Sequence, residues 1–179
     1  MGGLPALFLA VCSLAAASTA GAFTAADRPS GALRDCRTRG EGNRPQKLPT
    51  PPGVRIGPLV LWPSIRRRPD RAPPGSDWPY ILKAPVVLPA RSKVVLAIAP
   101  GAADRAAFQD RRGYVQAVRF EACREGVRAF AYKGTVGKFT GFPFAIGVAQ
   151  RSACIPMELW IDGRETPLRR LVPIGRRSC

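Results

Sequence analysis

Histidine is absent from this 179-residue sequence, and acidic residues are few, with 12 Asp and Glu against 28 Lys and Arg. Without histidine the chain cannot build a Ser-His-Asp or Cys-His catalytic arrangement, or a zinc site with histidine ligands. The sequence also contains no Cys-x-x-Cys pair, no Ser-x-x-Lys motif and no acidic calcium-binding loop. We therefore expect a protein that is not an enzyme and that needs no cofactor or metal. Two of the scattered carboxylates acting as acid and base remain an alternative.

A nucleotide phosphate loop is excluded as well, although GTVGK at residues 134–138 resembles the end of one. The motif G-x-x-x-x-G-K-[ST] would need glycine where Tyr132 stands, and serine or threonine where Phe139 stands. We interpret the segment as a turn.

The net charge of +16 is the strongest compositional signal. A surface of this charge attracts polyanions, and we favour an anionic cell-wall polymer or acidic lipid over nucleic acid. The densest basic cluster is Arg66, Arg67, Arg68 and Arg71, which we predict to contact the polyanion. The alternative is a solvated loop in a chain whose Arg, Ala, Gly and Pro content reflects high-GC coding.

Residues 1–22 are predicted to be a signal peptide. An apolar run from Leu4 to Ala17 is followed by Ala20-Gly21-Ala22, the small-x-small pattern of a cleavage site. The alternative is an uncleaved anchor, but the run is short for a span, which needs roughly 20 residues. We expect a secreted, extracellular protein, associated with the cell envelope and without a stable membrane span.

Removal of that segment leaves four cysteines: Cys36, Cys123, Cys154 and Cys179. An even number in an exported chain predicts two disulfides, and three pairings are open. Residue parity places Cys123 and Cys154 at strand ends, off the core face. This favours a bridge between Cys123 and Cys154 at the rim, with Cys36 bound to Cys179.

Short alternating segments separated by turn signals predict an all-β fold: an antiparallel β-sandwich (Ig-like) or small barrel of seven to eight short strands, disulfide-stapled. The clearest alternation places Ile155, Met157, Leu159 and Ile161 on one face. We expect a basic, irregular segment at 23–53 and one β-sandwich domain at 54–179. The expected strands are 54–62, 80–88, 93–99, 114–122, 127–132, 142–149, 155–161 and 168–174.

The connections are predicted from their turn residues. Residues 63–77 contain four prolines and are expected to form a long exposed loop. Pro85 predicts an edge strand or a bulge, residues 89–92 a hairpin, and Asp162-Gly163 a turn. Residues 101–112 are the one helix candidate.

A second candidate ligand surface lies at residues 128–144, where aromatic and cationic residues alternate. Such a mixture can stack on rings while pairing with anions. The candidate contacts are Phe130, Tyr132, Lys133, Lys138 and Phe139. The alternative is that these aromatics, with Phe142 and Phe144, are ordinary core residues of two strands.

Four segments together resemble a family of small secreted four-cysteine proteins of high-GC Gram-positive bacteria. They are DWPYILKAPVVLPARSKVVLAIA, YVQAVRFEAC, FTGFPFAIGVAQRSACIPMELWIDG and LVPIGRRSC. The match covers roughly residues 77–179. The resemblance implies export and a four-cysteine scaffold, and it implies no activity.

These observations favour an exported, non-enzymatic β-domain that binds or resides at the cell envelope through a basic surface. A nucleic-acid-binding basic protein and an enzyme of unknown chemistry are the alternatives.

Overall fold

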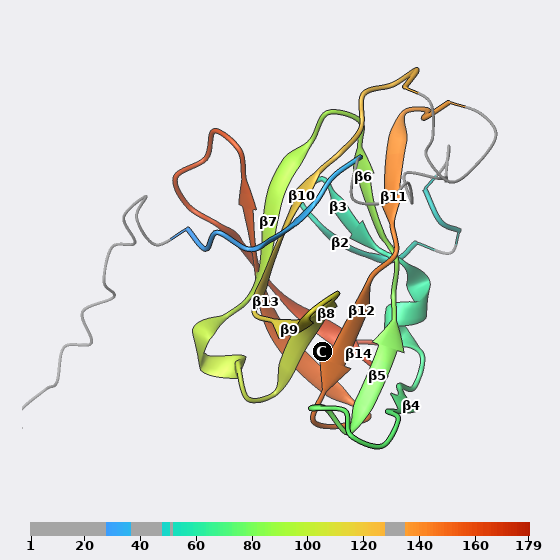
Figure 1. The fold of residues 1–179 in the computed structure, drawn as a ribbon, viewed down its shortest axis with the longest axis vertical. Helices are drawn as coiled ribbons and strands as arrows, with labels where there is room; N and C mark the ends of the chain where they lie inside the picture. Colours follow the sequence, from blue (N-terminus) through green and yellow to red (C-terminus); the bar gives the residue numbers. More distant parts are fainter. Residues whose placement is uncertain (1–27, 37–47, 51, 128–134) are drawn as a thin grey trace, which may run out of the picture.

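The computed structural model describes residues 28–36, 48–50, 52–127 and 135–179. Three sheets surround one core, and they do not close into a barrel (Figure 1). The predicted all-β, mainly antiparallel, disulfide-linked fold is confirmed. The number of strands is larger than expected. The expected strand 54–62 is divided at Gly57 and the expected strand 80–88 at Pro85, and strands also form at 32–34, 70–71 and 106–110, where none was expected.

Sheet A has the order β1-β10-β7-β13-β14, and β1 pairs with β10 in parallel. The neighbouring pairs β10–β7, β7–β13 and β13–β14 are antiparallel. The strands are β1 (Ala32–Arg34), β10 (Ala117–Glu121), β7 (Lys93–Ile98), β13 (Ala153–Ile161) and β14 (Leu168–Ile174).

Sheets B and C complete the fold. Sheet B, in order, contains β11 (Phe139–Phe142), β6 (Val86–Pro89), β3 (Leu59–Leu61) and β2 (Val54–Ile56). Sheet C, in order, contains β4 (Asp70–Arg71), β5 (Tyr80–Lys83), β12 (Ala145–Val148), β8 (Ala106–Asp110) and β9 (Gly113–Val115). Two short 3₁₀ helices are η2 (Pro63–Arg66) and η3 (Pro100–Ala102).

Four phenylalanines join the three sheets in the core. Phe120 of sheet A lies 5.2 Å, ring centre to ring centre, from Phe142 of sheet B and 5.6 Å from Phe144. Phe144 in turn lies 5.0 Å from Phe108 of sheet C. All four rings are buried. Tilted and edge-on pairs of this kind add to the stabilisation from apolar burial. Phe142 and Phe144 are therefore core residues.

A bent two-stranded ribbon connects sheets B and C. β5 and β12 pair in sheet C, and β6 and β11 pair in sheet B. The chain therefore passes from sheet C to sheet B between β5 and β6, and from sheet B to sheet C between β11 and β12, at the same place along the ribbon. The crossings occur at Ala84-Pro85 and at Pro143-Phe144. Proline has no N–H to donate to a ladder, and this favours a break at both places. Pro85 was expected to mark an edge or a bulge, and it instead marks a change of sheet.

Three of the predictions are wrong, namely the single strand at 54–62, the long exposed loop at 63–77 and the hairpin at 89–92. Residues 54–62 form the β2–β3 hairpin, with its turn at Gly57 (φ +53°). Residues 63–77 contain η2 and β4, and within them Ile65 is fully buried. The turn at 89–92 is present, but β6 and β7 leave it for different sheets and do not pair. The β13–β14 pairing around Asp162-Gly163 is confirmed.

The helix predicted at residues 101–112 is replaced by η3 and β8. β8 lies between β12 and β9, and Phe108 points into the core with no exposed surface. A short, weakly amphipathic segment gains little as a helix, and its β pairing buries Phe108.

The segment 23–53, predicted to be irregular, contains a strand. β1 lies within the predicted irregular segment 23–53 and forms the edge of sheet A beside β10. Residues 1–22 lie outside the described residues.

The four cysteines form two disulfides, but the predicted pairing is wrong. Cys36 bonds Cys123, and Cys154 bonds Cys179. Cys123 and Cys154 cannot meet because β7 separates β10 from β13. The register also places them at opposite ends of β7, since Glu121 faces Lys93 while Met157 faces Ile98.

Candidate functional site

A pocket of about 440 Å³ opens where the ribbon between sheets B and C bends. Both prolines of the bend and the residues beside them form one wall. The other wall comes from the end of β8 and from β1. The pocket is lined by Arg34, Lys83, Pro85, Gln109, Asp110, Arg111, Pro143, Phe144 and Ala145. The pocket therefore lies beside the two prolines at which the ribbon bends, and a hollow in the surface is a common form for a ligand site.

The pocket carries an excess of positive charge. Arg34, Lys83 and Arg111 stand against the single carboxylate of Asp110. The Nη2 of Arg34 lies 3.3 Å from Oδ1 of Asp110 and donates to the carbonyl of Gln109 at 3.0 Å. Three cations and one anion give the pocket lining a net charge of +2.

Arg34 is held in place before any ligand arrives. Its side chain is 16% exposed, and its Nε is buried without a hydrogen-bond partner. A buried donor without a partner is unusual, and each such group calls for an explanation. The exposed part of the same guanidinium can donate to a charged ligand group in the pocket.

An aromatic pair covers the outer face of sheet C. Ile146 and Val148 of β12 point into the core, so Gly147 between them faces outward. A Cβ at Gly147 would lie 2.5 Å from Cγ of Trp78 and 2.6 Å from Cε1 of Tyr114. The two rings therefore lie directly over the glycine, with centres 6.2 Å apart and planes at 60°. Only glycine lets them approach the backbone so closely.

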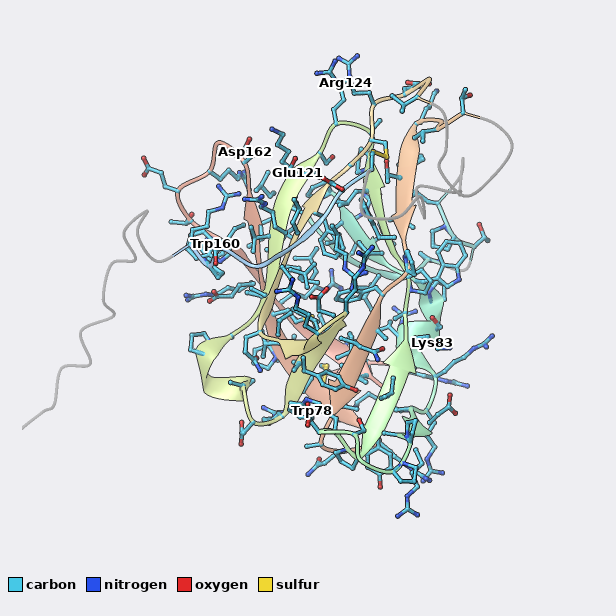
Figure 2. All side chains as sticks on the ribbon, viewed as in Figure 1. Trp78, Lys83, Glu121, Arg124, Trp160 and Asp162 are labelled. Atoms are coloured by element: carbon cyan, nitrogen blue, oxygen red, sulfur yellow. A yellow bond between two sulfur atoms is a disulfide. The ribbon has the colours of Figure 1, made fainter. Side chains whose placement is uncertain are left out.

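The aromatic pair and the pocket lie on the same face. Ala145 lines the pocket, and Gly147 lies beneath the rings of Trp78 and Tyr114. Residues two apart on a strand point to the same face, and their Cα atoms are about 7 Å apart. Across the ladder, Lys83 is opposite Ala145 and Ile81 is opposite Gly147. Figure 2 labels Trp78 and Lys83 on the half of the molecule that sheet C occupies. This surface, from Trp78 and Tyr114 to the pocket, is called the sheet C face below.

The predicted arginine cluster lies along one edge of sheet C. Arg66, Arg67, Arg68 and Arg71 are all exposed. Arg71 lies in β4, which pairs with β5. η2, which ends at Arg66, is tied to β5 because the hydroxyl of Ser64 donates to the carbonyl of Lys83 at 2.9 Å. The structure therefore brings the cluster to the strand that supplies the pocket lysine.

The second predicted ligand surface is not assembled by the described residues. Phe130, Tyr132 and Lys133 lie outside them. Lys138 is exposed and Phe139 is half-buried at the start of β11.

Another hollow, of about 360 Å³, lies over sheet A, and its charges are largely balanced. Its lining includes three cations and two carboxylates. Asp162 pairs with Arg28 at 3.7 Å, and Glu121 pairs with Arg119 at 3.5 Å. Figure 2 labels Glu121 and Asp162 there. The pocket beside Arg34 has the larger charge excess and is the stronger candidate.

Sequence reasoning missed the residues of the sheet C face. Arg34, Lys83 and Arg111 are far apart in the chain and belong to no motif. Two signals existed, namely a glycine inside the apolar run 144–148 and a proline inside each of two apolar segments. Each marks a place where a strand bends or another group approaches closely.

Comparison with protein-family models, curated proteins and solved structures finds no match for this chain. In the described ranges, no three His, Cys, Asp or Glu residues gather to hold a metal ion. Within the same ranges, no helix has the length and apolarity needed to cross a bilayer.

Proposed function

We propose that this protein is exported and binds an anionic polymer of the cell envelope through the sheet C face, as a binding protein and not as an enzyme. The observation that carries the proposal is the pocket in which Arg34, Lys83 and Arg111 face one carboxylate. The exposed arginines beside β5 extend this positive surface. Arginine guanidinium groups suit this role because their planar donors match carboxylate and phosphate oxygens.

Export is supported by the disulfides and by the sequence. Both disulfides join residues of a small domain, as is usual in oxidising compartments. The apolar N-terminal segment with its small-x-small cleavage pattern also supports export. The resemblance to small secreted four-cysteine proteins supports the envelope of a high-GC Gram-positive bacterium as the place of action.

Binding of the purified protein to isolated cell walls at several salt concentrations tests the proposal. We expect binding at low salt that weakens steeply as salt rises, because screening shortens the reach of surface charges. Arg34→Ala and Lys83→Ala should each weaken binding, the former by about ten-fold, since a charge-assisted hydrogen bond is lost. Arg164→Ala is the matched control. Arg164 is exposed in the turn after β13, and its substitution removes the same charge as Arg34→Ala.

Two results would contradict the proposal. One is cell-wall binding that does not respond to salt, or cell-wall binding that is weakened to the same extent by Arg34→Ala and by Arg164→Ala. The other is a native protein that keeps residues 1–22 and free thiols, as shown by intact mass with and without reduction. Tighter binding to duplex DNA than to cell walls would favour the nucleic-acid alternative.

A further inference from the structure

We infer that the polymer bound by the sheet C face is an acidic glycan, with a sugar ring packed on Trp78 and Tyr114 and its acidic group in the pocket beside Arg34. This inference rests on the proposed function and narrows its ligand from any polyanion to one class.

The aromatic pair supplies the first part of the argument. Trp78 and Tyr114 are half-buried, so each ring keeps part of its surface in contact with solvent. The C–H groups on one side of a pyranose ring form an apolar face that packs on an aromatic ring. Exposed aromatic surface with polar groups at its rim is a common composition for small-molecule sites.

The pair is also fixed before binding, which lowers the entropy lost when a ligand is ordered. The hydroxyls of Ser76 and Tyr114 lie 3.3 Å apart, and the backbone N–H of Trp78 donates to the Ser76 hydroxyl at 3.4 Å. Gly147 beneath sets how deeply both rings sit on the sheet. Hydroxyl groups at the edge of the pair can exchange hydrogen bonds with sugar hydroxyls.

Spacing and charge supply the second part. About 7 Å separates the aromatic pair from the pocket along β12, so one short saccharide can reach both. Gln109 is exposed at the pocket rim and offers amide groups for hydroxyl oxygens. Between the aromatic pair and the pocket, the cations lie together in the pocket, whereas single-stranded nucleic acid is usually bound by cations that track its backbone. A glycan with an acidic group on a sugar ring fits this arrangement better.

Isothermal titration of the full-length protein, with both disulfides formed, provides the test. Three probes separate the contributions: trigalacturonic acid has rings and carboxylates, inorganic tripolyphosphate has charge alone, and maltotriose has rings alone. We expect trigalacturonic acid to bind at least ten-fold more tightly than either of the others.

Variants assign each contribution to its residue. Trp78→Leu keeps apolar cover over Gly147 but removes the flat ring, and Tyr114→Leu does the same for its neighbour. Each should weaken trigalacturonic acid binding about ten-fold and leave tripolyphosphate binding within two-fold. Arg34→Ala should weaken both acidic probes. Near-ultraviolet circular dichroism and intact mass confirm that each variant is folded and oxidised, and either leucine variant alone suffices for the test.

The outcomes separate this inference from the proposed function. If tripolyphosphate binds as tightly as trigalacturonic acid, or if both leucine variants leave trigalacturonic acid binding unchanged, the glycan inference is wrong and the anion site stands. If a thymidine oligonucleotide binds more tightly than trigalacturonic acid and depends on Trp78, the rings stack on bases, and the inference is again wrong. If the wild type binds no acidic probe at low salt, both the inference and the proposed function are wrong.

Discussion

The guanidinium of Arg34 lies 3.3 Å from the carboxylate of Asp110, joining the edge strand of sheet A to the end of β8 in sheet C. This pair forms one side of the pocket, and both side chains are largely buried. Arg34 is two residues from Cys36, whose disulfide to Cys123 holds the end of β1. The position of Arg34 in the pocket therefore depends on the Cys36–Cys123 disulfide, which lies outside the pocket.

Removal of the Asp110 carboxylate should strengthen anion binding. In Asp110→Ala, Arg34 keeps its hydrogen bond to the Gln109 carbonyl, while the one negative charge of the pocket disappears. We expect the dissociation constant of tripolyphosphate to fall several-fold and its salt dependence to become steeper. Asp162→Ala removes an equal charge from the other hollow and serves as control. Weaker binding by Asp110→Ala would mean that the carboxylate is needed to position Arg34.

The disulfide connectivity can be read from a tryptic digest without reduction. Cleavage after arginine should release residues 35–37 joined to residues 120–124, and residues 152–164 joined to residues 178–179. Mass spectrometry distinguishes these pairs from every other combination. A linked pair of 120–124 with 152–164 would contradict the structure, because it requires a bond across β7.

Loss of the Cys36–Cys123 bond should reduce both stability and affinity. In the chain-entropy model a bridge that closes a loop of this length contributes on the order of 4 kcal/mol. We expect Cys36→Ser with Cys123→Ser to lower the free energy of unfolding in urea by about that amount. The same double variant should weaken tripolyphosphate binding, because β1 carries Arg34.

The other disulfide provides the comparison for that experiment. Cys154→Ser with Cys179→Ser removes a bridge that closes a shorter loop, worth about 3 kcal/mol in the same model. This variant should leave tripolyphosphate affinity unchanged. Equal losses of affinity in the two double variants would show that general destabilisation, and not the position of Arg34, controls binding.

Trp160 should be among the most sensitive positions outside the main core. It is 1% exposed and packs with Val95, Ala97 and Ala117 on the second face of sheet A. Truncation of a buried tryptophan costs about 3–5 kcal/mol. We expect Trp160→Ala to lower the free energy of unfolding in urea by this amount. Leu171→Ala, at a side chain 55% exposed, should change it by less than about 0.5 kcal/mol. Similar effects at the two positions would contradict the described burial.

Local pattern was sufficient to identify the core face of β13. Residues 155–161 alternate in the sequence, and Ile155, Met157 and Leu159 are fully buried on the predicted side. The alternation did not reveal that Trp160 on the opposite side is also buried, because its cover comes from packing that a single strand does not encode. The arginine cluster was correctly expected to be exposed, and its place beside Lys83 was not foreseeable.

The sequence by itself determined the all-β class, the main strands and the presence of two disulfides, because two-residue periodicity, turn residues and an even number of cysteines are local or countable properties. The tertiary structure alone decided the pairing of those cysteines, the three-sheet arrangement and the sheet C face. Cys123 and Cys154 fit a bridge by parity, but the order of strands places β7 between them. Arg34, Lys83 and Arg111 line one pocket because the fold brings the ends of β1, β5 and β8 together beside the bend of the ribbon. Contacts between residues this far apart depend on strand order, and no local pattern records it.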